Sequence, residues 1–182
     1  MYTFDSRVRY SETDADAHLT IESIIDYMQD CTNFQSEDLG VGLEYHRERQ
    51  IMWVLMDLKK GRPMIVTPEI GDVYGIHEPL QMDYASRKIR VPQQDGETLP
   101  GYVVQEYHLD ANHHVNNGQY VRMALAAIKE EITVRELRVE YRKQAVLGDE
   151  MVPVVYRMDS EYLVTLNGAD GKPYAVVQLF IR

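Results

Sequence analysis

Polar residues suited to acid–base chemistry gather in one short stretch of the sequence, 108–120. The carboxylate of Asp110 could act as a base or as a nucleophile, and the imidazole of His114 can transfer a proton near neutral pH. Amide side chains accompany them at Asn112, Asn116 and Asn117. Such a set could position a water molecule, accept its proton and stabilise an oxyanion, which is what hydrolysis at a carbonyl carbon requires.

The same stretch directly precedes a predicted helix, and this position has two interpretations. Free backbone N–H groups at a helix start favour negative charge, so Asn117 and Gly118, with Asn116 beside them, are candidates for an oxyanion hole. Asp and Asn before a helix are also common as caps and turn formers without any catalytic role. Both interpretations stay open at the level of the sequence.

Two other chemistries are less well supported by the residues. His108, His113 and His114 lie close together, but their spacing matches no standard zinc pattern and no cysteine pair accompanies them. Cys31 is the only cysteine. It lies on the apolar face of a predicted helix, where a small buried hydrophobe is more typical than a nucleophile. We therefore expect neither a metal nor a cofactor.

The composition limits the classes of function. The 182 residues are 45% hydrophobic, which is enough for a sizeable core. The 19 Lys and Arg residues against 29 Asp and Glu give a formal charge of −10, which argues against broad nucleic-acid binding. The sequence shows no signal-peptide pattern and no apolar run of membrane-spanning length. We expect a soluble, cytoplasmic protein without a membrane or nucleic-acid partner.

The elements that must position the candidate residues are clearest in the second half of the chain. Alternation predicts a strand over 102–109, and helical spacing predicts a helix over 118–128, with the polar turn between them. Alternation predicts four further strands, over 132–144, 150–158, 162–168 and 173–182. A helix buried against one face of an antiparallel sheet is an α+β architecture. In this order the elements predict the hot-dog fold, a curved sheet wrapped round a central helix.

The first half carries a shorter version of this pattern. Alternation predicts a strand over 2–10, helical spacing predicts helices over 19–34 and 37–50, and a buried strand is predicted over 51–58. Residues 59–100 hold five of the seven prolines of the chain. Because each proline biases its predecessor away from helix, this region is predicted to be an extended connector.

The chain also matches itself once, since 14–19 (DADAHL) aligns with 110–115 (DANHHV). Both segments follow a predicted strand and precede a predicted helix, which favours a duplicated domain. The alternative is that both are only capping turns. The second copy has asparagines at 112, 116 and 117, where the first has Asp16, Thr20 and Ile21. The second copy is therefore the better candidate for the working site.

The motif D-x-N-x-H-V-N-N, formed by Asp110, Asn112, His114, Val115, Asn116 and Asn117, resembles the signature of the acyl-acyl-carrier-protein thioesterases of bacteria and plants. Further similarity lies in RVRYSETDADAHLTIESIIDYMQD, WVLMDLKKGRP and LRVEYRKQAVLGD, so the resemblance touches nearly the whole chain. It implies tandem hot-dog domains with catalysis in the second, carried by Asp110, Asn112 and His114. Gln144 stands at a further polar position that is often Glu in plant members.

The resemblance also implies a reaction and a partner. The reaction is hydrolysis of a fatty acyl thioester to free fatty acid. The partner is acyl carrier protein with its phosphopantetheine-linked acyl chain. Two other functions stay open, an acyl-CoA thioesterase and a non-catalytic acyl-binding or scaffold protein.

The first half departs from the family in length. The family has a complete sheet between the first helix and the WVLMDL strand, and the strands that should lie there are missing. We expect a shortened, incomplete N-terminal hot-dog domain over 1–75, a linker over 76–100 and a C-terminal hot-dog domain over 101–182 with the active site. Because so short a sheet cannot cover a helix alone, we expect a homo-oligomer such as a dimer, unless the chain is internally shortened.

Overall fold

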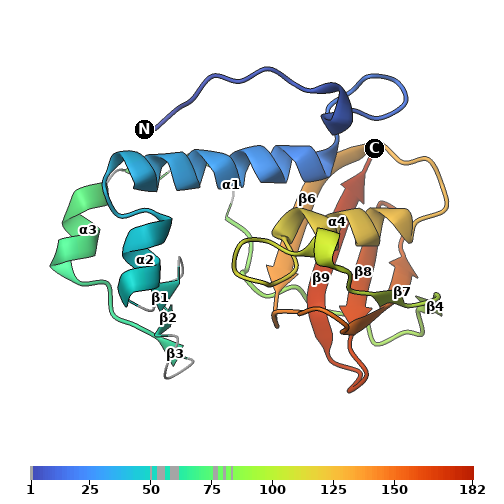
Figure 1. Cartoon of the computed structure of the whole chain (residues 1–182). Helices are drawn as coiled ribbons and strands as arrows, with labels where there is room; N and C mark the ends of the chain where they lie inside the picture. Colours follow the sequence, from blue (N-terminus) through green and yellow to red (C-terminus); the bar gives the residue numbers. More distant parts are fainter. Residues whose placement is uncertain are drawn as a thin grey trace. The chain divides into compact units, whose positions relative to one another are not determined.

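Four long antiparallel strands make the sheet of the C-terminal half in the computed structural model (Figure 1). They are β6 (Val134–Tyr141), β7 (Glu150–Arg157), β8 (Glu161–Asn167) and β9 (Pro173–Ile181). Two short strands, β4 (Glu97–Thr98) and β5 (Tyr102–Val103), pair with β7. The sheet order β4-β7-β8-β9-β6 places β6, which follows the helix in the chain, at the far edge. The four strands predicted after the helix are all present.

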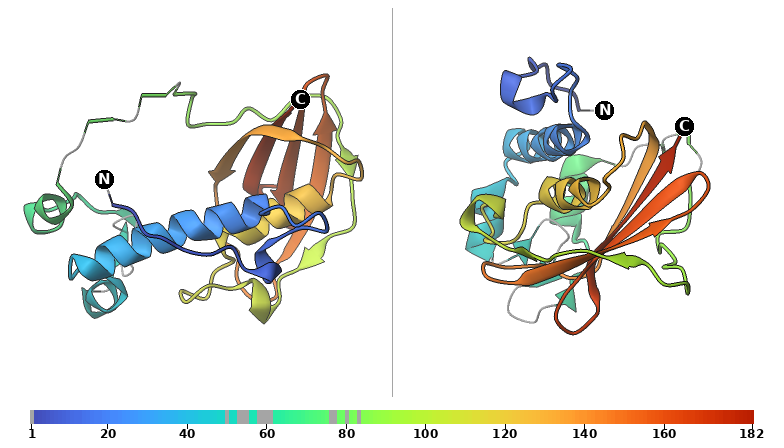
Figure 2. Two further views of the ribbon diagram at one scale, coloured as in Figure 1. Left: turned by 90° about the horizontal axis from the view of Figure 1, so that it is seen from above. Right: turned by 90° about the vertical axis from the view of Figure 1, so that its right-hand side faces the viewer.

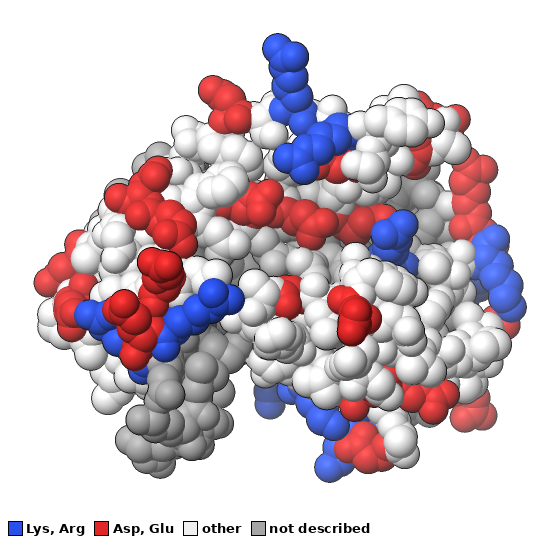
Figure 3. Space-filling view, in the orientation of Figure 1, with Lys and Arg blue, Asp and Glu red and all other residues white. Residues whose placement is uncertain are grey.

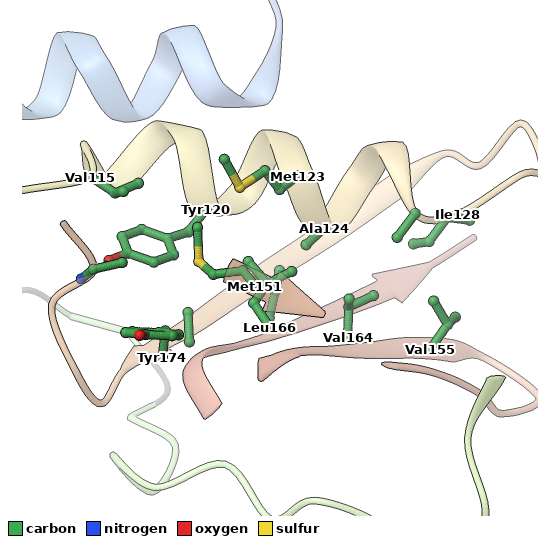
Figure 4. Close-up of a cluster of buried hydrophobic side chains, with 14 of the residues drawn as sticks. Val115, Tyr120, Met123, Ala124, Ile128, Met151, Val155, Val164, Leu166 and Tyr174 are labelled. Atoms are coloured by element: carbon green, nitrogen blue, oxygen red, sulfur yellow. The ribbon is translucent and has the colours of Figure 1, made fainter. Parts of the chain in front are cut away.

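Helix α4 (Asn117–Ala126) packs on one face of this sheet, and Figure 2 shows the sheet curving round it. Tyr120, Met123 and Ala124 recur at helical spacing and are buried against the sheet. The strands contribute their alternate residues to the same core, among them Met151, Val164 and Leu166 (Figure 4). The C-terminal half therefore has the predicted α+β hot-dog arrangement.

The opposite face of the sheet is covered by the extended chain that precedes the hot dog. Ile89 is buried with Leu163 and Val176, whose side chains point away from α4. The N–H of Ile89 donates to Glu140 Oε2 at 2.8 Å, and Arg142 Nη2 donates to the carbonyl of Ile89 at 2.8 Å. Contacts accordingly divide the chain into two compact units, Met1–Leu19 with Ile24–Asp83 and Thr20–Ser23 with Tyr84–Arg182. The structure describes residues 2–49, 51–52, 56–57, 62–75, 78–79, 81–82 and 84–182, with only the backbone for 51–63.

The N-terminal unit is mainly helical. Its elements are the 3-10 turn η1 (Tyr10–Glu12), α1 (Ile21–Asp38), α2 (Leu43–Arg49) and α3 (Pro68–Tyr74), together with β1 (Ile51–Met52), β2 (Met56–Asp57) and β3 (Arg62–Pro63). The three short strands pair antiparallel in the order β1-β2-β3. The chain leaves α1 through Gly40, whose φ of 71° lies in the left-handed region that glycine adopts readily. Within the described residues this sheet is much shorter than that of the second half.

The strand predicted over 2–10 is wrong. Residues 2–9 pair with no strand of the described chain and lead into η1. Phe4 packs on a helix instead, since its ring lies 6.1 Å from that of Tyr27 and 5.2 Å from that of Phe34. Tyr27 also donates a hydrogen bond from its hydroxyl to the carbonyl of Arg7 at 3.1 Å. Phe4 thus contacts α1, whereas Val8 and Tyr10 are exposed, so the alternation does not correspond to one buried face.

Three other predicted elements also differ. The single strand over 51–58 is instead β1 and β2, which pair antiparallel, so the chain reverses between them; residues 53–55 and 58 of that prediction lie outside the described residues. Within the predicted connector, Pro68 begins α3, because the first helical turn tolerates proline. The strand over 102–109 ends after Val103, and the 3-10 turn η2 (Glu106–His108) follows it.

Candidate active site

Asp110 closes a tight loop at the entrance to α4. Its N–H donates to the carbonyl of His114 at 2.8 Å, and its own carbonyl accepts from the N–H of His113 at 3.0 Å. The side-chain oxygen Oδ1 accepts from the N–H of Asn112 at 2.8 Å and from that of His114 at 3.2 Å. His113 has a φ of 61°, in the left-handed region. The carboxylate therefore shapes the loop, as the turn-forming interpretation requires.

The chemistry of Asp110 depends on its second oxygen. Oδ2 has no hydrogen-bond partner within the described part of the chain, and the side chain is half-buried. One oxygen therefore holds the loop while the other is available to a water molecule or a substrate. The structural and the catalytic interpretation are compatible in this geometry.

The first copy of the repeat forms the same loop. The N–H of Asp14 donates to the carbonyl of His18 at 2.9 Å, and Asp14 Oδ1 accepts from the N–H groups of Asp16 and His18 at 3.0 and 2.9 Å. Ala17 has a φ of 62°, which matches that of His113. The two segments thus share backbone geometry as well as sequence. Because both copies use the carboxylate in this way, the loop hydrogen bonds by themselves do not identify the working copy.

His114 holds a buried nitrogen in the loop. Its Nδ1 atom is buried and has no hydrogen-bond partner among the described residues. Buried polar groups are nearly always paired, so an unpaired imidazole nitrogen beside a carboxylate is a candidate for contact with a ligand. Asn112 and His113, by contrast, are exposed.

The start of α4 changes the expected oxyanion hole. Asn116 is the N-cap, and its Oδ1 accepts from the N–H of Gly118 at 2.7 Å. Gly118 is buried and its N–H is already engaged by this cap, so its role as an oxyanion donor stays a prediction. The N–H of Asn117 has no partner within the described residues and is the free candidate donor of the pair.

The loop between β6 and β7 is fastened to the motif through Ala145. The carbonyl of Ala145 accepts from the N–H of Val115 at 2.9 Å, and its N–H donates to the phenolic oxygen of Tyr120 at 2.9 Å. Figure 4 shows the Tyr120 ring below α4, with its hydroxyl directed at a backbone nitrogen. Gln144, the residue before Ala145, is exposed. Gln144 is therefore one residue from a backbone contact with the motif, whereas the role of Tyr120 was missed because the sequence marks it only as a core residue.

His108, two residues before Asp110, has a shifted pKa. Burial, and to a smaller extent the positive charge of Arg122, lowers the pKa of His108. Its Nδ1 atom accepts from the N–H of Gln105 at 3.0 Å, which requires that this nitrogen carries no proton.

Within the described residues, no group of three His, Cys, Asp or Glu side chains has metal-site geometry.

Acidic side chains follow α1 on the face shown in Figure 3. Glu22, Asp26 and Asp30 are spaced four residues apart on this helix, which places them on one side. Such a surface repels phosphate groups. No helix in the described ranges is long and apolar enough to cross a membrane.

Comparison with known proteins finds a family model that matches the part of the chain that holds this site. Residues 92–168 match the model of the acyl-ACP thioesterase C-terminal domain, a range that includes the whole Asp110–Gly118 segment and Gln144. No curated protein sequence matches the chain.

Solved structures resemble the fold over nearly the whole chain. A Lactobacillus plantarum protein assigned to the oleoyl thioesterases has a TM-score of 0.85 at 16% identity, with 100% of this chain and 95% of that chain covered. An acyl-ACP thioesterase from Bacteroides thetaiotaomicron has a TM-score of 0.78 at 16% identity, with 95% and 94% covered. A 12:0-ACP thioesterase from Umbellularia californica has a TM-score of 0.77 at 16% identity, with 96% and 94% covered.

These solved structures share the fold of this chain, and residues 92–168 are similar to the C-terminal domain of the acyl-ACP thioesterases.

Proposed function

We propose that this protein hydrolyses the thioester that joins a fatty acyl chain to the phosphopantetheine group of acyl carrier protein. The observation that carries the proposal is the family match over 92–168, which contains the Asp110–His114 loop. The loop offers a carboxylate oxygen and a buried imidazole nitrogen, both without a partner in the described chain, beside the free N–H of Asn117.

In this reaction a water molecule attacks the carbonyl carbon, the C–S bond breaks, and fatty acid and thiol are released. Asp110 accepts the proton of the water, or attacks the carbonyl itself to form an anhydride that water then hydrolyses. The N–H of Asn117 stabilises the developing oxyanion. His114 delivers a proton to the departing sulfur or polarises the carbonyl. Asn112 and Gln144 orient the water or the carbonyl group.

Purified protein mixed with acyl-ACP should release free fatty acid and an equal amount of thiol. Asp110→Asn is the decisive variant, because its amide oxygen can still accept the two loop hydrogen bonds while the base is lost. We expect at least about a hundredfold loss of kcat. Asp14→Asn makes the same change in the first copy and should leave kcat unchanged. A folded wild-type protein that releases nothing at any chain length would refute the proposal.

The same assay separates the alternatives. Acyl-CoA substrates of matching chain length measure the preference between CoA and carrier protein through the ratio of kcat/KM values. A protein that co-purifies with fatty acid but turns over neither substrate is a binding or scaffold protein.

A further inference from the structure

We propose that Tyr120 is a positioning residue that holds Gln144 against the Asp110–His114 loop. This inference rests on the proposed function, because it assigns to Gln144 a part in the hydrolysis. Tyr120 lies on the second turn of α4, and Gln144 lies in the loop between β6 and β7.

Ala145 is the link between the two residues. Its N–H belongs to the peptide group that joins it to Gln144, and its carbonyl belongs to the peptide group that follows. The phenolic oxygen of Tyr120 fixes the first group at 2.9 Å, and the N–H of Val115 fixes the second at 2.9 Å. Because peptide groups are planar, holding both restricts the backbone dihedrals of Ala145 and the direction from which Gln144 enters. We call these two hydrogen bonds of Ala145, with Tyr120 and with Val115, the clamp. Because Val115 follows His114 in the chain, the clamp sets the position of Gln144 relative to the imidazole of His114.

The clamp is buried. Relative exposure is 0% for Ala145, 3% for Tyr120 and 4% for Val115. Water therefore cannot easily replace the phenol as the acceptor for the N–H of Ala145. Burial also raises the pKa of Tyr120, so the hydroxyl keeps its proton at neutral pH and accepts through a lone pair.

A second contact ties the clamp to the helix start. The rings of Tyr120 and Tyr141 meet edge to face with centroids 5.6 Å apart, and the hydroxyl of Tyr141 donates to the carbonyl of Asn117 at 3.1 Å. Tyr120 thus contacts both the residue after Gln144 and the tyrosine that is hydrogen-bonded to Asn117. The ring of Tyr120 packs in the core, whereas its oxygen accepts the hydrogen bond from Ala145 in the loop between β6 and β7.

Tyr120→Phe tests the oxygen alone, since the ring remains. The N–H of Ala145 loses its buried partner, and we expect kcat to fall about tenfold with KM changed less than about twofold. A double-mutant cycle with Gln144→Ala shows whether the oxygen acts through Gln144. When Gln144 is already absent, Tyr120→Phe should lower kcat by less than about twofold. Equal losses in both backgrounds would mean a merely structural role and would overturn the proposal.

The matched control is Tyr156→Phe, because Tyr156 packs on the opposite face of the sheet with Ile89. This variant should leave kcat unchanged. If Tyr120→Phe does not fold, ring-fluorinated tyrosine at position 120 keeps the shape and weakens the oxygen as an acceptor. It should give a smaller kcat loss, again only with Gln144 present, and a loss that persists without Gln144 refutes the clamp.

Hydrogen exchange separates failure of this inference from failure of the proposed function. The amide of Ala145 should exchange slowly in the wild type and faster in Tyr120→Phe, while Tyr156→Phe leaves it slow. This result does not depend on turnover. A wild type without activity refutes the function, whereas an Ala145 amide that Tyr120→Phe leaves unchanged refutes the clamp.

Discussion

At the scale of single residues, the Asp110 carboxylate carries both structure and proposed chemistry. Asp14 repeats only the structural part, because its loop lacks the asparagines that follow Asp110. Asp14 therefore serves as a comparison for Asp110, because it makes the same loop hydrogen bonds without the neighbouring asparagines. Loss of the loop bonds and loss of the base can be measured separately.

Replacing Asp110 by alanine removes the acceptor for two backbone N–H groups, those of Asn112 and His114. We expect this change to lower the free energy of unfolding by about 1–2 kcal/mol, and Asp110→Asn to cost less than half of that. Urea denaturation of both variants measures the difference. If neither variant loses stability, the loop hydrogen bonds contribute nothing to stability and the role of Asp110 is chemical alone.

His108 should make the site sensitive to mild acid. Its lowered pKa means that the folded protein takes up this proton less readily than the unfolded chain. The contribution of His108 to the free energy of unfolding is therefore fully present above its unfolded pKa of about 6.5. This contribution is lost as the pH falls from there through the pKa of the folded state. A protonated Nδ1 would also meet the N–H of Gln105 with a second donor.

His108→Asn keeps an acceptor for the N–H of Gln105 but does not titrate. The urea midpoint measured between about pH 5 and 7.5 should decline less in this variant than in the wild type. Parallel declines in the two proteins would contradict the assignment to His108.

At the scale of elements, the sequence predicted the hot-dog fold because its strands are long and their hydrophobic residues face a core. Five of the seven residues of β8 and five of the nine of β9 are buried, and in β7 the buried residues alternate, so local pattern and final environment agree. Over 2–10 the pattern failed, because an aromatic residue such as Phe4 fits a helix surface as well as a sheet. Tyr120 and Ala145 are 25 positions apart in sequence, and nothing local marks their hydrogen bond. The hydrogen bond from the N–H of Gly118 to Asn116 is likewise not settled by the sequence pattern.

The cap of α4 should have a measurable value. Asn116→Ala leaves the N–H of Gly118 without its acceptor, and we expect a loss of about 1 kcal/mol in unfolding free energy. Asn117→Ala is the control, since its exposed side chain makes no cap and should cost less than about 0.5 kcal/mol. Thermal melts of the two variants provide the comparison, and a smaller shift for Asn116→Ala would contradict the cap.

At the scale of the whole molecule, the edge of the sheet at β6 favours the proposed dimer. In the described chain β6 pairs with β9 alone, so its other edge ends the sheet. Such an edge is a template for another strand. The residues of β6 that share a face with Val176 and Gln178 of β9 alternate in charge, with Glu136, Arg138 and Glu140 in turn. If two copies pair antiparallel about Leu137, Glu136 of each copy faces Arg138 of the other.

This geometry makes the assembly testable through charge. We expect twice the mass of one chain in light scattering. Arg138→Glu should shift the protein toward monomer, because it sets like charges opposite each other across the twofold axis. Adding Glu136→Arg to that variant restores opposite charges in the same register and should restore the dimer. A wild-type protein that is monomeric at all concentrations rules out the β6 dimer. A dimer insensitive to both substitutions shows that the copies meet elsewhere.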